Sequence, residues 1–535
     1  MSGGTEEERA EGADDGRTPE DEHAQGADDG HTPEEERARS ADDTTARPRE
    51  GTRHGLPELI AERRTKARHL RDTDPEAFPY AFADVEPVAS ILEAYEHLAT
   101  GEETEEAHRV AGRIAARRGS GKAAFLDLVD RTGKIQLHAR VDVLGEEPYQ
   151  RLLSLDLGDL IGVDGAILRS RHGELTLRVD SYQILAKALR PPPDKHHGLT
   201  DVETRLRRRE LDLIANEDVR GLFINRARIV SAVRSYLDEN GFVEVETPVL
   251  QPLYGGALAR PFTTHHNELD RDLYLRIATE LYLKRLLVGG LERVYELGKD
   301  FRNEGVSHKH NPEFTMVEFY EAYADYSDEA IRLEELVRSA AAAIDYAGEL
   351  DFAGPWRRVT FAQAIAAQTG IEVMEHRDVQ RLHAAISRLD LDVQINGDTW
   401  FQLADDLLSK LVEPTLIQPT FVIDYPVELS PFARTHRSQP GLVERWEAFA
   451  GGMEIANAFT ELIDPDVQRE RFEAQTRLAD IGGEETQPYD ELFVEALEQG
   501  MPPAGGVGVG IDRLVMLLTG RDSIREVVLF PALRS

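Results

Sequence analysis

One polar loop between two apolar, strand-like runs constrains this chain more than any other feature. It begins at Arg302 and leads into the run EFTMVEFYEAY, which ends at Tyr323. Its polar side chains are Arg302, Glu304, His308, Lys309, His310 and Asn311. Cations make charge-assisted bonds to phosphate oxygens, and flanking strands fix where those bonds point. The stretch therefore predicts a β-hairpin that holds a polyphosphate; the alternative is a basic surface hairpin, because loops are polar by default.

The strand after this loop favours the binding interpretation. Its residues Phe314, Met316, Glu318 and Tyr320 share one face, since side chains alternate at period two. Phe314 and Met316 suit a core face. Glu318 does not, unless a positive group meets it, because a buried unpaired carboxylate is costly.

The charge and composition exclude several classes of function. The net charge of the chain is −37, and residues 1–50 alone contain 17 acidic and 6 basic residues. An acidic body repels phosphate on average, so nucleic acid would have to bind at local basic patches. The absence of cysteine excludes disulfides, a thiol nucleophile and Cys-ligated zinc. No apolar run approaches the ~18 residues of a membrane span and no signal peptide is visible, so we expect a soluble, cytoplasmic protein without a membrane partner.

The N-terminal part divides into a tail and a helical region. GADDGRTPEDE, from Gly12, recurs as GADDGHTPEEE from Gly26, and residues 1–52 are predicted to be a disordered acidic repeat tail. Residues 53–107 are predicted to be helical. The helix Leu56–Leu70 is rich in arginine and lysine, which fits either a solvated face or a face for a polyanion.

Residues 108–189 predict a small barrel. Five short strands separated by turns are typical of an all-β oligonucleotide-binding (OB) fold. Candidate contacts to single-stranded bases are Arg118, Lys122, Phe125, Gln136 and Glu174. An aromatic ring with nearby cations and polar edges suits base stacking. The alternative for Phe125 is a core position, because it adjoins Leu126 and Leu128.

Residues 190–215 are predicted to be a linker, and residues 216–535 a larger α+β domain with a helical insertion around 324–400. The linker contains RLRRR (Arg205–Arg209), which suits contact with RNA or an acidic protein surface. Asn225–Asn240 predicts an amphipathic helix, Ala278–Leu287 a second helix with Glu280 near its start, and Ile417–Leu429 a strand.

The C-terminal stretch combines a glycine face with a cation. Gly506, Gly508 and Gly510 alternate on one strand, so a flat ligand or another backbone can approach closely. Asp512 is predicted to cap a helix ending at Gly520. Arg513 in its first turn opposes the helix dipole, which predicts that it meets an anion.

The polar residues before this stretch are compatible with either a helix or a strand. Glu454, Asn457 and Glu461 have the spacing of a helix face, whereas a strand needs a bulge near Ala456 to turn Glu454 the same way. The histidine pairs lack the spacing and partners of a zinc site.

These stretches resemble one family. GFVEVETPVLQ with GGALARPF, FRNEGVSHKHNPEFT, and GVGVGIDRLVMLL look like the three ordered motifs of class II synthetases. ATELYLKRL, VEFYEAYADY and MEIANAFTEL narrow the resemblance to class II lysyl-tRNA synthetases of the bacterial type, from about Leu56 to Leu533. The resemblance implies a catalytic domain with an antiparallel sheet flanked by helices, preceded by the OB-fold anticodon-binding barrel.

The resemblance implies roles at the nucleotide end of the site. The implied ATP-binding residues are Arg302, Glu304, His310, Asn311, Phe314 and Arg513. Arg302 and Arg513 are the implied catalytic residues: Arg302 on the α-phosphate and substrate carboxylate, Arg513 with His310 on the β- and γ-phosphates. Phe314 would stack on adenine. Lys309 stands where the family has arginine, which keeps the charge but loses the fork.

It also implies the other contacts. The implied lysine-binding residues are Gly256 (or Gly255), Glu280, Glu318, Tyr320, Asn457 and Glu461. Glu447 and Glu454 would hold magnesium, with several Mg²⁺ ions per site. Arg118, Phe125, Gln136 and Glu174 would contact the anticodon. The implied partners are ATP, L-lysine, tRNA(Lys) and a second copy of the chain in a homodimer.

Three other interpretations compete. An aspartyl- or asparaginyl-type synthetase needs a cation where Glu318 and Glu461 stand. A synthetase-like ligase that modifies a protein would lack the barrel. A non-catalytic paralogue would have lost groups such as Arg302, Glu454 or Arg513, which are all present.

Overall fold

The computed structural model describes residues 55–533, apart from 120, 194–198, 390, 392–393, 431 and 481–486 and the side chains of 478–480. The predicted acidic repeat tail, 1–52, lies outside these residues.

A closed barrel follows two N-terminal helices. The helices are α1 (Leu56–Thr73) and α2 (Val88–Ala94). The barrel strands are β1 (Glu103–Arg118), β2 (Ala123–Val129), β3 (Lys134–Arg140), β4 (Leu160–Arg169), β5 (Leu175–Arg178) and β6 (Ser181–Ala186). The order is β1-β2-β3-β5-β4-β6, and a further β1–β4 pairing closes the sheet around one apolar core. The OB-type barrel is thus confirmed, with its first strand starting before 108 and its last predicted run divided in two.

Two features of the barrel region differ from the sequence analysis. Helices α3 (Val141–Leu144) and α4 (Glu146–Ser154) lie between β3 and β4. In α1, Arg63 does not serve a polyanion: it is buried and donates to the backbone oxygens of Leu157, Ala188 and Arg190 at 3.0–3.3 Å.

The predicted linker contains two helices, α5 (Val202–Arg207) and α6 (Arg209–Ala215). Arg209 is buried, pairs with Asp212 at 2.6 Å and donates to the carbonyls of Arg525, Val528 and Leu529. The hypothesis that this arginine contacts RNA is therefore wrong, because its donors are spent on the protein's own backbone.

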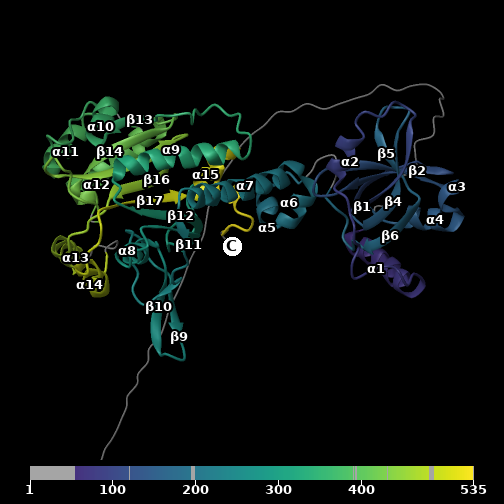
Figure 1. Ribbon diagram of the computed structural model, residues 1–535, viewed down its shortest axis with the longest axis horizontal. Helices are drawn as coiled ribbons and strands as arrows, with labels where there is room; N and C mark the ends of the chain where they lie inside the picture. Colours follow the sequence, from purple (N-terminus) through teal and green to yellow (C-terminus); the bar gives the residue numbers. More distant parts are fainter. Residues whose placement is uncertain are drawn as a thin grey trace, which may run out of the picture. The chain divides into compact units, whose positions relative to one another are not determined.

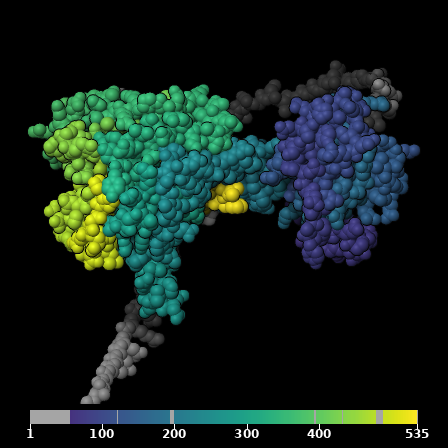
Figure 2. Space-filling model, viewed as in Figure 1, coloured from purple at the N-terminus to yellow at the C-terminus, as the bar shows by residue number. Residues whose placement is uncertain are grey.

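An eight-stranded sheet organises the rest of the chain (Figure 1). Its order is β13-β14-β15-β16-β17-β12-β11-β7, antiparallel except for the outer pairs β13–β14 and β11–β7. The strands are β7 (Val243–Glu244), β11 (Arg293–Phe301), β12 (Glu313–Ala322), β13 (Arg357–Thr360), β14 (Thr420–Pro426), β15 (Leu442–Ala450), β16 (Met453–Thr460) and β17 (Ala504–Gly510). A small second sheet contains β8 (Leu250–Gln251), β9 (Thr263–His266) and β10 (Arg271–Leu275), and the β9–β10 hairpin stands out from the surface (Figure 2).

Helices cover the faces of this sheet. α7 (Glu217–Glu239), α9 (Tyr326–Ala342) and α15 (Ile511–Thr519) bury one face in the largest apolar core, with residues such as Val233, Leu333 and Leu514. The remaining helices are α8 (Glu280–Val288), α10 (Phe361–Thr369), α11 (Val379–Ile386), α12 (Trp400–Leu407), α13 (Pro465–Asp480), α14 (Glu491–Glu498) and α16 (Ile524–Val527).

Strand β12 shows how the chain separates core from site. Val317 and Phe319 are fully buried in the helix-covered core. The alternate residues, Phe314 and Met316 among them, line a cavity on the other face. Phe314 and Met316 suit a core by residue type, but the core takes the odd-numbered residues of this strand, so both lie on the cavity face, as the ATP-binding role implied for Phe314 requires.

The start of α15 also differs from the sequence analysis. Gly510 occupies the N-cap position, and Asp512 lies inside the first turn. The Asp512 carboxylate instead accepts from the backbone N–H of Thr315 at 2.7 Å and pairs with Arg226 at 2.6 Å. It thus ties the helix to β12 and α7, a task that capping propensity does not reveal. The predicted end is right, since Gly520 is the left-handed C-cap.

One buried carboxyl in α9 gives a stability prediction. Glu329 is fully buried, and neither carboxyl oxygen has a hydrogen-bond partner among the described residues. Burial, together with nearby Glu321, raises its pKa well above the usual range. We expect Glu329→Leu to stabilise the protein by about 1–3 kcal/mol at pH 7.5, because it removes an unsatisfied polar group. Thermal unfolding measures this gain.

The pH dependence of stability provides a control for the effect of Glu329→Leu. The native carboxyl keeps a proton that the unfolded chain releases, so the stability of the wild type falls as pH rises above the ordinary carboxyl range. The gain from Glu329→Leu should therefore grow with pH, while Glu329→Gln removes the titration but retains a buried polar group. A less stable leucine variant at pH 8 would show that Glu329 has a partner.

Candidate active site

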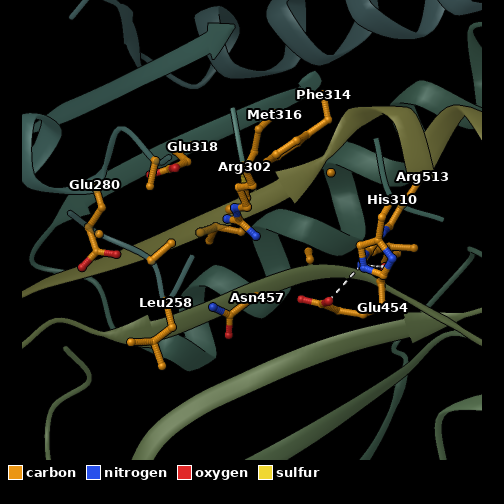
Figure 3. A pocket seen from close by; sticks show the side chains of 18 of the residues that line it. Leu258, Glu280, Arg302, His310, Phe314, Met316, Glu318, Glu454, Asn457 and Arg513 are labelled. Carbon is orange, nitrogen blue, oxygen red and sulfur yellow. Dashed lines mark hydrogen bonds and ion pairs between the residues drawn. The ribbon is translucent and has the colours of Figure 1, made fainter. Parts of the chain in front are cut away.

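A cavity of about 400 Å³ lies on the face of the sheet opposite to α7 and α9. It is lined by all the predicted catalytic-domain site residues except Glu447 and Glu461. Glu280 lies at one end and Arg513 at the other, with Arg302 and Asn457 between them (Figure 3). The structure therefore brings together residues that are more than 200 positions apart in the sequence.

The register of the strands explains the floor of this cavity. Glu318 in β12 lies opposite Gly508 in β17, which in turn lies opposite Asn457 in β16. One step along, Tyr320 lies opposite Gly506. Gly506 and Gly508 leave the middle strand without side chains on the cavity face, and we call this surface the glycine floor. The groups on the neighbouring strands therefore face an open channel.

A β-bulge resolves the spacing problem in β16. Ala456 pairs with Ala448, but Glu454 pairs with the next residue, Phe449, so Ile455 is the extra residue. The bulge reverses the alternation and turns Glu454 toward the cavity that Asn457 also lines. The segment is a strand with the bulge one residue from its expected position.

Arg302 and Phe314 form the middle of the nucleotide end. Arg302 follows β11 directly, and its guanidinium lies 5.1 Å from the centre of the Phe314 ring. Its backbone N–H donates to Pro312 O at 2.9 Å, which closes the loop that carries Glu304. Asn311 is buried and its side chain is tied to the backbone of Glu313 and Ala532.

Arg513 joins two other predicted residues. It donates to the Glu454 carboxylate at 2.8 Å and contacts Nε2 of His310 at 3.3 Å. Burial, then Arg513 and Lys309, lower the pKa of His310 to about 4, so the ring is neutral at pH 7. Although burial opposes it, Arg513 holds the pKa of Glu454 below its usual value. Arg513 thus meets an anion as predicted. Lys309 pairs with Glu413 at 2.5 Å.

The opposite end of the cavity is a cluster of buried carboxyl groups. Glu318 accepts from the backbone N–H of Thr279 at 3.0 Å and from the Tyr320 hydroxyl at 3.2 Å. Burial, with a contribution from Asp300, raises the pKa of Glu318 to about 8. Burial also raises the pKa of Glu461 to about 8, against the opposing effect of Lys284. Burial thus favours the neutral form of both carboxyl groups unless a cation pairs with them.

Glu461 is fully buried beside the glycine floor. A Cβ atom on Gly506 would lie 2.1 Å from its Oε1. Near Glu280, the backbone N–H of Gly256 donates to Gln487 Oε1 at 3.2 Å.

The last predicted residue of the catalytic domain, Glu447, lies in β15 opposite Asn457. It accepts from Tyr425 at 2.8 Å and pairs with Arg445 at 2.5 Å. Burial raises its pKa to about 7. Among the described residues, no group of three or more His, Cys, Asp or Glu side chains is arranged to hold a metal ion.

Two buried cations of the site were missed by sequence reasoning. Lys284 pairs with Glu280 and Glu461, and Arg445 donates to Asn457 Oδ1 at 2.8 Å. Both occur in amphipathic segments that contain other charged residues, where a cation is normally interpreted as solvent-exposed. The strand alternation between Arg445 and Glu447 was the available signal.

The barrel presents its predicted residues on one side of its sheet. Phe125 is half-exposed and stacks on His138, with ring centres 4.6 Å apart, while its neighbours Leu126 and Leu128 are buried. Phe125 is therefore not a core residue. Gln136 donates to Glu174 at 2.8 Å, and Arg118 to Asp127 at 3.0 Å.

Comparison with known proteins identifies the family of this arrangement. The family model of class II tRNA synthetases (D, K and N) matches residues 201–534, which contain the whole cavity. The chain belongs to the class II tRNA synthetases. A model of the OB-fold nucleic acid binding domain matches residues 108–185. In this synthetase, the described residues include no helix long and apolar enough to span a membrane.

Individual relatives of the synthetase are similar along nearly their whole length. Lysine–tRNA ligase of Carboxydothermus hydrogenoformans is 49% identical over 486 residues, which are 90% of this chain and 98% of the relative. The enzymes of the same name from Thermosynechococcus vestitus and Bacillus subtilis are 50% and 47% identical, over 89% and 90% of this chain and 97% and 98% of theirs.

Proposed function

We propose that this synthetase is a lysine–tRNA ligase that uses the cleavage of ATP to AMP and diphosphate to attach L-lysine to tRNA(Lys). The observation that carries the proposal is the pair of buried carboxyl groups, Glu318 and Glu461, beside the glycine floor. A lysine ammonium would supply a cation to both, whereas an apolar or acidic side chain would leave Glu318 buried without a cation and Glu461 with Lys284 alone. The relatives of the chain carry the same name.

The chemistry needs no protein nucleophile. The lysine carboxylate attacks the α-phosphorus of ATP, the bond to the pyrophosphate oxygen breaks, and lysyl-adenylate forms. A hydroxyl of the terminal tRNA ribose then attacks the carbonyl carbon, and AMP leaves. The protein's contribution is positioning and neutralisation of developing charge.

We assign the nucleotide contacts from this geometry. Arg302 donates to the α-phosphate and the substrate carboxylate, and Phe314 stacks on adenine beside Glu304 and Asn311. Arg513 and the neutral His310 donate to the β- and γ-phosphates. Because Arg513 is paired with Glu454 before ATP binds, phosphate has to replace that carboxylate as its partner.

Glu454 and Glu447 are the groups that fit Mg²⁺. Carboxylate oxygens suit this hard cation, which commonly takes one or two carboxylates and completes its shell with phosphate and water. The raised pKa of the Glu447 carboxyl is consistent with a buried group that a cation would ionise. Bound Mg²⁺ would neutralise phosphate charge.

The amino acid contacts complete the assignment. Glu318, Tyr320 and Glu461 receive the ε-ammonium. Gly256 and Glu280 receive the α-amino group, and Asn457 the carboxylate.

Pyrophosphate exchange tests the proposal. Purified protein with ATP and labelled pyrophosphate should show exchange that depends on L-lysine and on no other amino acid of a panel that includes aspartate and asparagine. Exchange with another amino acid and none with lysine would refute the assignment.

We also propose that the barrel, residues 108–189, binds the anticodon while residues 216–535 catalyse. Phe125→Ala should lower kcat/KM for tRNA(Lys) by about 10–100-fold, since one base stack contributes ~1–3 kcal/mol. Lysine-dependent exchange should stay within about twofold, and Phe125→Tyr, which keeps the ring, should behave like the wild type. Equal losses of charging and exchange would contradict a separate anticodon role.

A homodimer is the proposed assembly. The short edge strand β7 and the segment after it expose apolar side chains: Val243, Val249 and Leu250 are 41–49% exposed. An unpaired edge with exposed apolar residues favours association. Sedimentation velocity should show twice the chain mass; a monomer at micromolar concentration would refute this.

A further inference from the structure

Lys284 is the one residue of the carboxyl cluster that sequence reasoning gives no role. It lies one turn after Glu280 on α8, and its side chain is completely buried. Its Nζ lies 2.5 Å from Glu280 Oε1 and forms an ion pair with Glu461 Oε2. Its ammonium also lies 5.5 Å and 5.3 Å from the ring centres of Phe432 and Phe459.

Packing does not account for this lysine. An apolar side chain would fill the same space in α8 without the cost of removing an ammonium from water. Lys284 stays charged nonetheless: burial lowers its pKa, but Glu280 and Glu461 together raise it above the ordinary value. A charge kept at such cost indicates a task beyond stability.

The way Lys284 binds leaves acceptors for a ligand. It engages one oxygen of each carboxylate, Oε1 of Glu280 and Oε2 of Glu461. Oε1 of Glu461 accepts no hydrogen bond from any described residue and lies beside the glycine floor. Glu280 itself lines the cavity (Figure 3).

We infer that Lys284 is a positioning residue for the amino acid: it orients Glu280 and Glu461, and the cluster carries two negative charges once a bound cation has ionised its carboxyl groups. With Glu318, the cluster has three carboxyl groups and one ammonium. Free L-lysine carries two ammonium groups, which match these two negative charges, while its carboxylate is assigned to Arg302 and Asn457. The inference rests on the proposed function, because the count applies to a substrate with two ammonium groups.

Other titratable groups face the cluster and contribute to its total charge. They are Glu318 and Tyr320 from β12, Asp300 from β11 and Glu329 from α9. Of these, Asp300 is paired with Arg276 at 3.1 Å. Lys284 is thus the cation that directly contacts Glu280 and Glu461 among the described residues.

The pH dependence follows with a definite sign. Substrate ammonium binds the ionised carboxylates, so affinity for L-lysine is present above the pKa of about 8 that Glu461 has in the empty site. It is lost as pH falls through that value. Without Lys284 the carboxyl groups would ionise only at higher pH.

Lys284→Met in the full-length protein tests the inference. We expect the KM for L-lysine in pyrophosphate exchange to rise about 30-fold or more at pH 7.5, because two buried carboxylates lose their charged partner. The KM for ATP should change less than about threefold, since the nucleotide end of the cavity is untouched. Between pH 6.5 and 9.5, the midpoint of the fall in KM for lysine should move up by about one pH unit or more.

Three control variants distinguish the positioning role of Lys284 from a general effect on folding. Lys284→Arg keeps the charge, so its midpoint should stay at the wild-type pH even if its KM rises. Arg285→Met removes the neighbouring cation of α8 outside the cluster and should change neither quantity. If Lys284→Met does not fold, Lys284→Gln, which retains a donor without charge, takes its place.

The outcomes are distinct. An unchanged KM for lysine, or KM values for lysine and ATP that rise together without a shift in midpoint, would overturn the inference. Wild-type protein that shows no lysine-dependent exchange would instead refute the proposed function, and the inference with it.

Discussion

We expect Arg302→Ala to lower kcat of lysine-dependent pyrophosphate exchange by about 10³-fold, the cost of losing one preorganised donor to developing charge. Arg302 is suited to this role because it directly follows β11 and its guanidinium is held 5.1 Å from the Phe314 ring. The loss should appear in kcat more than in the KM for ATP, since the interaction strengthens as negative charge shifts at the α-phosphate.

Arg302→Lys is the matched control for this result. It retains the charge but loses the planar fork, so its rate should fall between those of the wild type and the alanine variant. Steady-state exchange at saturating lysine and ATP measures the difference. Activity of the alanine variant within tenfold of the wild type would remove Arg302 from the catalytic residues.

Gly506→Ala should raise the KM for L-lysine by about 10²-fold. The new Cβ would lie 2.1 Å from Glu461 Oε1 and 2.3 Å from Tyr320 Cε1, and both side chains are buried. Because neither can move away freely, the specificity end of the cavity has to distort, at the usual cost of overpacking.

Gly508→Ala is the comparison on the same strand. Its Cβ would meet Met316 Cε at 2.7 Å, the flexible end of a long side chain, and Glu318 Cγ only at 3.8 Å. The KM for lysine should therefore rise less than tenfold in this variant. Similar losses in both variants would show that the floor is sensitive to any side chain rather than to the carboxyl end.

The sequence indicated which residues line the cavity better than it indicated how the framework packs. Glu318 was conspicuous because a carboxylate interrupts an apolar alternation, and such a misfit marks function rather than folding. The glycine face of β17 was visible for the same reason. By residue type alone, Phe314 and Met316 suited a core, since periodicity shows which residues share a face but not which face the helices cover.

Contacts between distant segments explain the other errors. Asp512 reads as a helix cap from its neighbours, but its partners, Thr315 and Arg226, lie about 200 and 290 positions away. Arg209 was interpreted as a contact to RNA or an acidic protein surface because its actual acceptors belong to the distant C-terminal segment. Local propensity contains no information about such partners, so only the folded chain reveals them.

The bulge at Ile455 has a consequence for changes in chain length. Inserting one further residue between Ala456 and Asn457, with the bulge kept, would turn Glu454 to the opposite face of the strand, into the core under α9 and α15, while every residue of the motif was still present. A chain can therefore retain all of its catalytic side chains and lose the geometry that makes them a site. Length at this position is a functional property of its own, which comparisons of residue identity alone do not detect.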